Sequence, residues 1–220
     1  MFEINLFINP LSKFCFEMEK KLMKLAEKRK QIFRIRFIPI ISLKKIEHII
    51  YTCFKYMTSP EERQRIFKNI YSAILDVKTA SLQGQKKGQN FLINFQQKII
   101  QEKQRDYSTN LAKELATSSQ VDIEMFLEDR QSLSVKNAFY RDQQKVKDLH
   151  LKSLPAALIF DFNSNEDGVI IENYLPEVLN LLSQKNIASM EQLFDALIYK
   201  YDIVLENKPD FKHRFTDLTC

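Results

Sequence analysis

The sequence is poor in the residues that end helices, with only 3 glycines and 6 prolines among 220 residues. Lys, Glu, Gln, Leu and Ile are abundant instead, and this composition favours helices over tightly turned sheets. No apolar run approaches the roughly 20 residues that a membrane-spanning helix needs. With 45% apolar residues, the chain can bury a sizeable core, as one elaborated domain or two small ones. We therefore expect a helix-rich α/β protein.

The sequence also lacks the features of an exported protein. Its first residues, MFEINLFINP, contain neither a basic start nor a small-residue cleavage site. The cysteines are an odd number, which favours reduced thiols over a disulfide framework. These cysteines are Cys15, Cys53 and Cys220. We therefore expect a cytoplasmic protein.

Several kinds of functional site have no counterpart in the sequence. The net charge of +5 is small and acidic residues lie between the basic ones, which disfavours nucleic-acid binding. His48, His150 and His213 have no metal-ligand spacing among themselves or with the cysteines. There is also no glycine-rich phosphate loop and no Ser/His/Asp signature. We therefore expect no metal site and no cofactor.

The N-terminal stretch FEINLFINPLSKFCFEM contains the strongest pattern in the chain. It predicts a strand over residues 3–9, a tight turn at Asn9-Pro10 and a helix that begins near Ser12. A redox protein would carry a Cys-x-x-Cys motif at such a helix start, where backbone N–H groups and the macrodipole stabilise a thiolate. Here Ser12 takes the first position and Cys15 the second, so only half of a dithiol is present.

Both residues of this incomplete motif have a functional and a structural interpretation. Cys15 is either a thiol with a lowered pKa that forms mixed disulfides, or a small buried residue retained by packing. Ser12 is either catalytic or a helix cap. Because no second cysteine of this motif could resolve a mixed disulfide, we expect negligible reduction of insulin by the native protein.

The hydrophobic pattern predicts strands only near the two ends of the chain. The helix over residues 12–28 and a second strand over residues 32–41 complete a β-α-β unit. Residues 156–162 and 168–174 form an antiparallel hairpin. Two short helices follow, at residues 176–182 and 189–201, and a polar tail at residues 206–220 ends the chain.

Between residues 42 and 150 the pattern predicts about five or six helices and no strand. Cys53 lies in the apolar stripe of the first of these helices. Ser59-Pro60-Glu61-Glu62 is a capping box that begins the second. The segment SLQGQKKGQN, residues 81–90, contains two of the three glycines and is expected to be a loop or a mobile segment. Further helices are expected at residues 91–102, 109–116, 122–128 and 134–149.

This order of elements resembles a thioredoxin-like fold with the all-helical, DsbA-type insertion between strands 2 and 3. The run from Leu111 to Phe162 is similar to the part of DsbA-family proteins in which an alanine-bearing helix, an Asp-led helix and a Ser-x-x-Val helix precede a proline that opens the third strand. The resemblance implies a thioredoxin-like domain from residues 1–41 and 151–202, an inserted helical domain from residues 42–150, and a tail from residue 203.

The resemblance also implies a site. In such proteins the proline before the third strand is cis and faces the Cys-x-x-Cys helix, which assigns this role to Pro155 and implies a cis Leu154-Pro155 bond. Leu154 departs from the family, where Thr, Val or Ser is usual. Pro10, Leu154 and Pro155 are the expected binding residues, beside Ser12 and Cys15 as the candidate catalytic pair.

Within the family, the sequence looks most like cytoplasmic members with a proline-rich active-site turn. These are related to the adaptor that delivers the regulator Spx to the ClpXP protease, although the histidine-rich N-terminal segment of that adaptor is missing here. Two function classes follow. The first is a protein-binding adaptor with a protein partner such as an Spx-like regulator. The second is a monothiol thiol-disulfide oxidoreductase or isomerase, or a glutathione-dependent transferase with Ser12 activating glutathione.

Overall fold

The computed structural model divides the chain into two compact units. The first contains Met1–Ile8, Glu17–Ile38 and the chain from Leu149 onward; the second contains Asn9–Phe16 and Pro39–Asp148. The helix predicted around Cys53, the tail and Cys220 lie outside the described residues. The structure describes residues 1–29, 33–41, 59–102, 106–130, 132–162, 168–172, 175–184, 187 and 189–201.

The first unit is built on a four-stranded sheet with the order β2-β1-β3-β4. All four predicted strands are confirmed. β1 and β3 pair antiparallel from Phe2 opposite Asp161 to Phe7 opposite Ala156, and the hairpin partner β4 places Ile171 opposite Ala157. The strands are β1 (Phe2–Ile8), β2 (Phe33–Pro39), β3 (Ala156–Asp161) and β4 (Val169–Ile171).

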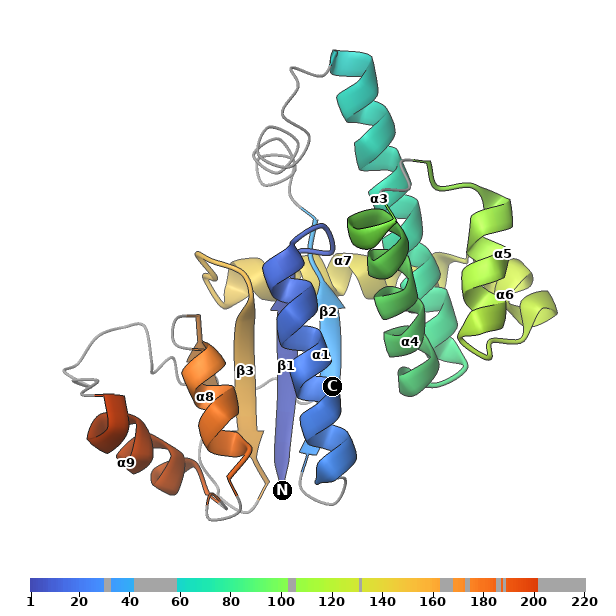
Figure 1. Ribbon diagram of the computed structural model, residues 1–220. Helices are drawn as coiled ribbons and strands as arrows, with labels where there is room; N and C mark the ends of the chain where they lie inside the picture. The colour runs from blue at the N-terminus through green and yellow to red at the C-terminus, as the bar shows by residue number, and fades with distance from the viewer. Residues whose placement is uncertain are drawn as a thin grey trace. The chain divides into compact units, whose positions relative to one another are not determined.

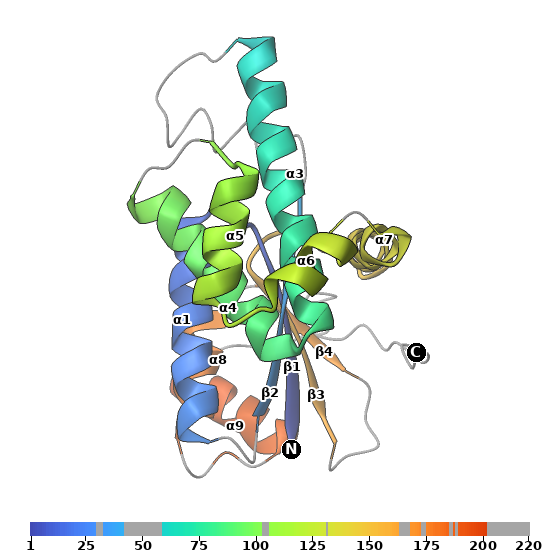
Figure 2. The ribbon, with the colours of Figure 1, turned by 90° about the vertical axis from the view of Figure 1, so that its right-hand side faces the viewer.

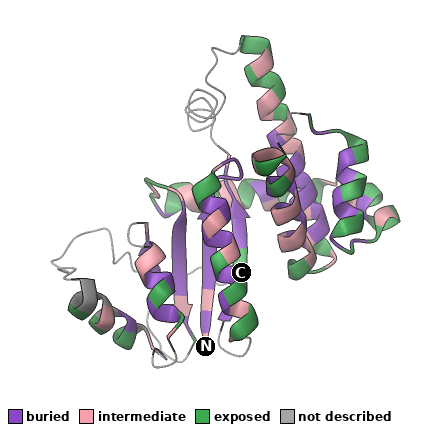
Figure 3. Cartoon of the chain, in the orientation of Figure 1, coloured by how far each residue is buried: buried purple, intermediate pink, exposed green. Residues whose placement is uncertain are grey.

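The central strands are buried along almost their whole length (Figure 3), which is why their sequences are nearly continuous apolar runs. Helices α1 (Lys13–Lys28) and α8 (Leu175–Leu182) cover one face of the sheet (Figures 1 and 2), and α9 (Met190–Tyr201) follows α8. Arg29, just after α1, donates to the carbonyl oxygens of Leu182 and Gln184, both at 2.8 Å. This contact ties the end of α1 to the end of α8.

The second unit is helical, and its described residues from 59 to 148 contain no strand. The predicted helix start is confirmed: Ser59 is the N-cap, and its hydroxyl accepts a hydrogen bond from the backbone N–H of Glu62 at 3.2 Å. The elements are α3 (Pro60–Leu82), α4 (Gln85–Gln96), a π-helical turn η1 (Gln97–Gln101), α5 (Thr109–Ser118), α6 (Ile123–Asp129) and α7 (Leu133–Asp148).

The prediction of a loop at residues 81–90 is wrong. The chain turns only at Gln83 and Gly84, where Gly84 has a φ of +133°, and α4 begins at once. Gly88 does not break this helix but permits a close approach, because a Cβ atom at its position would lie 1.9 Å from the Ser81 Oγ atom. The two glycines therefore allow a tight turn between α3 and α4, which pack against each other.

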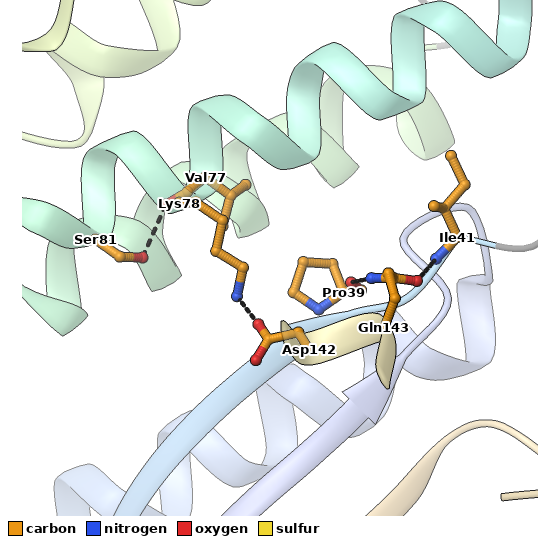
Figure 4. A network of polar contacts seen from close by, with 7 residues as sticks. All are labelled: Pro39, Ile41, Val77, Lys78, Ser81, Asp142 and Gln143. Carbon is orange, nitrogen blue, oxygen red and sulfur yellow. Dashed lines mark hydrogen bonds and ion pairs between the residues drawn. The ribbon is translucent and has the colours of Figure 1, made fainter. Parts of the chain in front are cut away.

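Helix α7 is joined to α3 and to the segment that leaves β2 (Figure 4). Lys78 of α3 forms an ion pair with Asp142 of α7. The Gln143 amide accepts from the backbone N–H of Ile41 at 3.2 Å and donates to the carbonyl oxygen of Pro39 at 3.3 Å. The side chain thereby satisfies both backbone groups, as a neighbouring strand would.

A buried carboxylate stabilises the middle of the second unit. The Asp76 side chain is 1% exposed and accepts hydrogen bonds from Arg130 Nε at 2.7 Å and from the Tyr107 hydroxyl at 2.5 Å. Burial raises the pKa of the Asp76 carboxyl above its ordinary value, while the hydrogen bonds from Arg130 and Tyr107 oppose the rise. Arg130 also donates to Thr109, so the network connects α3, α5 and the end of α6.

Replacing Arg130 with Met should remove the charge that compensates Asp76. We expect the free energy of unfolding to fall by about 3 kcal/mol near neutral pH, because one buried charge loses its partner. The loss should be smaller at about pH 5, because removing Arg130 takes away a group that lowers the pKa of the Asp76 carboxyl, so the variant gains more than the native protein from protonation of Asp76.

Urea unfolding followed by circular dichroism at both pH values measures the effect. Arg65→Met is the matched control, because Arg65 forms ion pairs at the surface and is 52% exposed, so its removal should cost less than about 1 kcal/mol. An Arg130→Met loss that is equally large at both pH values would contradict the role assigned to Asp76.

Candidate functional site

The turn between β1 and α1 is organised by Asn9. Its side-chain oxygen accepts from the backbone N–H of Leu11 at 3.0 Å, and its carbonyl oxygen accepts from the N–H of Ser12, also at 3.0 Å. Both bonds are local, and together they close the turn that Asn9-Pro10 predicts. Asn9 and Pro10 are buried, so the turn is part of the packed structure.

Ser12 caps α1. Its hydroxyl oxygen accepts from the backbone N–H of Cys15 at 3.2 Å, and its carbonyl oxygen accepts from the N–H of Phe16 at 3.0 Å. This pattern is that of an N-cap serine bonded to the third residue of the helix. The capping interpretation of Ser12 is therefore confirmed, and Cys15 lies in the first helical turn as expected. A catalytic role for Ser12 stays a prediction.

Cys15 carries a thiol that is fully buried, with 0% of the residue exposed. Its Sγ atom accepts a hydrogen bond from the backbone N–H of Asn9 at 3.4 Å. The neighbouring Phe16 is buried as well, whereas Phe14 is 51% exposed. A thiol in this position contributes to packing and to the turn, and its reactivity stays a prediction.

Leu11 anchors the turn in the second unit. It is 8% exposed and belongs to the same apolar cluster as Ile74 of α3 and Phe139 of α7. Because Leu11 lies between Asn9 and Ser12, the apolar cluster fixes the turn that precedes the helix containing Cys15. By its contacts this turn groups with the helices of the second unit. The resemblance places residues 1–41 in the thioredoxin-like domain, and those domain bounds stay a prediction.

The segment before β3 contains the second set of predicted site residues. The Leu154-Pro155 peptide bond is cis, which confirms that prediction. Pro155 is buried, Leu154 is half-buried, and Lys152 and Ser153 are exposed. The predicted proximity of Pro155 to the Ser12–Cys15 turn and the binding roles of Pro10, Leu154 and Pro155 stay predictions.

Two glutamates near these segments were missed from the sequence. Glu19 is 0% exposed, four residues after Cys15 and on the same face of α1. Its burial could have been predicted, because Glu19 lies at helical spacing between Cys15 and Leu22 on the apolar face of the helix. Glu172 follows β4, and its carboxylate accepts from the backbone N–H groups of Lys152 and Ser153 at 2.6 and 2.7 Å. No local pattern indicates such a contact, because it joins residues about twenty positions apart.

Two further findings concern metals and membranes. Within the described part of the chain, no three or more His, Cys, Asp or Glu side chains come together in a way that could hold a metal ion. None of the helices in that part combines the length and apolar character needed to cross a membrane.

The chain belongs to the thioredoxin family, whose model matches residues 5–180. Among solved structures it is similar to a candidate protein disulfide isomerase from Nitrosomonas europaea, with a TM-score of 0.61 and 16% identity over 91% of this chain and 98% of that one. It is also similar to the cytosolic disulfide reductase DsbM from Pseudomonas aeruginosa, with a TM-score of 0.55 and 10% identity over 82% and 95% of the two chains. At these identities the similarity establishes the fold alone, and it confirms the predicted thioredoxin-like fold with a helical insertion.

Curated relatives are similar in sequence as well. The ClpXP adapter protein SpxH of Bacillus cereus is 29% identical over 197 residues, which cover 80% of this chain and 65% of the relative. SpxH of Bacillus subtilis is 26% identical over 182 residues, which cover 76% of this chain and 61% of the relative. The predicted relation to this adaptor is confirmed. The chain nevertheless spans less than two thirds of the length of these relatives.

The position of Ser12 at the helix start allows a test of whether the absence of a second cysteine explains a lack of dithiol activity. We expect negligible insulin reduction by the native protein, because a mixed disulfide at Cys15 would need an outside thiol to resolve it. Ser12→Cys should introduce measurable dithiol activity, since residue 12 lies at the helix start, three residues before Cys15.

Insulin turbidity with dithiothreitol as reductant measures this activity. Ser12→Ala is the control: it should remain inactive and lose about 0.5–2 kcal/mol of stability through the lost cap. Turnover by the native protein that disappears in Cys15→Ser would show that the single thiol is itself catalytic.

Proposed function

We propose that this chain is a protein-binding adaptor of the thioredoxin family that presents a regulator to the ClpXP protease. The observation that carries the proposal is its similarity to ClpXP adapter proteins named SpxH, which extends over about four fifths of the chain. The partner would be an Spx-like regulator, and the work would take place in the cytoplasm.

The local chemistry at the helix start supports binding rather than redox catalysis. A dithiol enzyme needs a second thiol within reach of the first. Here the first motif position is Ser12, whose hydroxyl oxygen is used by the helix cap, and the remaining Cys15 is fully buried. Attack by a thiolate also requires access to the target disulfide. An adaptor, in contrast, needs neither group to react.

The proposed docking surface lies on the loop before β3. The half-buried Leu154 supplies apolar contact beside the exposed Lys152 and Ser153, and the buried Pro155 ends the loop from within the packed structure. The inserted helices, with the turn that the buried Pro10 stiffens, are a second proposed binding surface. Apolar contacts bordered by polar residues are typical of protein interfaces.

A thiol enzyme is the second candidate, either a monothiol oxidoreductase or a glutathione-dependent transferase. Two observations favour it: Cys15 lies in the first turn of a helix, and the fold is shared with the disulfide reductase DsbM. Tight binding of glutathione by the native protein would support it.

A degradation assay tests the adaptor. Purified ClpXP and the Spx-type regulator from the source organism are mixed with and without this chain, and the loss of regulator is followed on gels. We expect the chain to accelerate degradation about tenfold or more, because it raises the effective concentration of the regulator at the protease.

Leu154→Asp should reduce this acceleration, since it places a charge on the proposed surface. The control is Tyr199→Asp, a comparable change at a residue of α9 that is 94% exposed and lies outside the surface. If the native chain caused no acceleration while glutathione bound tightly, the enzyme would replace the adaptor as the best account.

A further inference from the structure

Glu172 is brought to the loop before Pro155 by the register of the hairpin. Ile171 lies opposite Ala157 in the antiparallel pair of β3 and β4. Continuing this register by one residue sets Glu172 opposite Ala156, where β3 begins. The glutamate side chain can therefore reach the segment that precedes β3, although it follows β4 in the sequence.

The contact consists of two hydrogen bonds from backbone N–H groups to one carboxylate oxygen. A single carboxylate oxygen, Oε1 of Glu172, accepts from the N–H groups of Lys152 and Ser153 at 2.6 and 2.7 Å. Hydrogen bonds to an ionised acceptor are about twice as strong as neutral ones. The side chains of Lys152 and Ser153 remain exposed while their backbone is fixed.

The same loop follows the end of α7. His150 has a φ of +51°, the left-handed conformation in which helices commonly end and which histidine adopts more readily than most residues. The segment from Leu151 to Leu154 leaves this helix ending and is then bonded to Glu172. These features argue for a loop held in one shape, rather than for a connection that is free to vary.

We propose that Glu172 is a positioning residue that orders the loop of residues 151–154 in advance for docking of a polypeptide partner. This inference rests on the proposed function, because the loop lies in the proposed docking surface. Ordering the backbone of a loop costs conformational entropy. When Glu172 has already fixed the loop in the free protein, that cost does not recur on binding, and affinity is higher.

Three variants test the role of Glu172. Glu172→Ala removes the acceptor, whereas Glu172→Gln keeps an oxygen that can accept both N–H groups. Glu191→Ala changes an exposed glutamate on α9 and is the control. Two quantities are measured on the full chain. The first is amide hydrogen exchange of Lys152 and Ser153 by NMR, without partner. The second is the dissociation constant of the Spx-type regulator, with thermal unfolding to confirm that each variant is folded.

We expect Glu172→Ala to speed exchange at both amides and to weaken binding about tenfold, the effect of leaving roughly one more residue to be ordered on binding. Glu172→Gln should keep much of the exchange protection and of the affinity of the native protein. Glu191→Ala should change neither quantity. Faster exchange with unchanged affinity would overturn the positioning role, and so would unchanged exchange. Failure of the native protein to bind the regulator would instead overturn the proposed function, and with it the docking role of this loop.

Discussion

The short connection between β1 and α1 is the constraint on which the candidate site depends. Four residues must reverse the chain and satisfy the first N–H groups of a helix whose start is packed. Asn9 closes the turn by accepting from the N–H groups of Leu11 and Ser12. Ser12 accepts from the N–H groups of Cys15 and Phe16 at the start of the helix. Cys15 is held by the same arrangement, because its N–H bonds to Ser12 and its Sγ atom accepts from Asn9. Ser12 is therefore an integral part of the local structure and does more than replace a missing cysteine.

The two segments that contain predicted site residues are each stabilised by polar side chains that bond to backbone groups. Asn9 and Ser12 hold the turn before α1, and Glu172 holds the loop before β3. Such contacts fix backbone shape while leaving neighbouring side chains exposed, as at Phe14 and Lys152. A recognition surface benefits from fixed backbone because less entropy is lost on binding. A dithiol catalyst would also need a second thiol, and Ser12 cannot supply one.

Much of the fold could be predicted because its signals are local. Apolar runs, alternating in the first two strands, located the four strands, and the Ser59 cap located the start of α3. The segment around Gly88 was misassigned because glycine in a helix was interpreted as a break, whereas here it permits contact with Ser81. Glu172 escaped prediction because its partners are brought close only by the register of the hairpin. The anchoring of Leu11 among the inserted helices depends on tertiary packing in the same way.

We propose that this protein binds its partner without using thiol chemistry, because Cys15 is buried and the Ser12 position holds no second thiol. The most direct measurement is the dissociation constant of the Spx-type regulator for the native chain and for Cys15→Ala, determined by calorimetry with and without dithiothreitol. We expect values that agree within a factor of about three in all four conditions, since a non-covalent interface does not depend on a buried thiol. Binding that is lost in Cys15→Ala, or a complex that dithiothreitol releases, would contradict it.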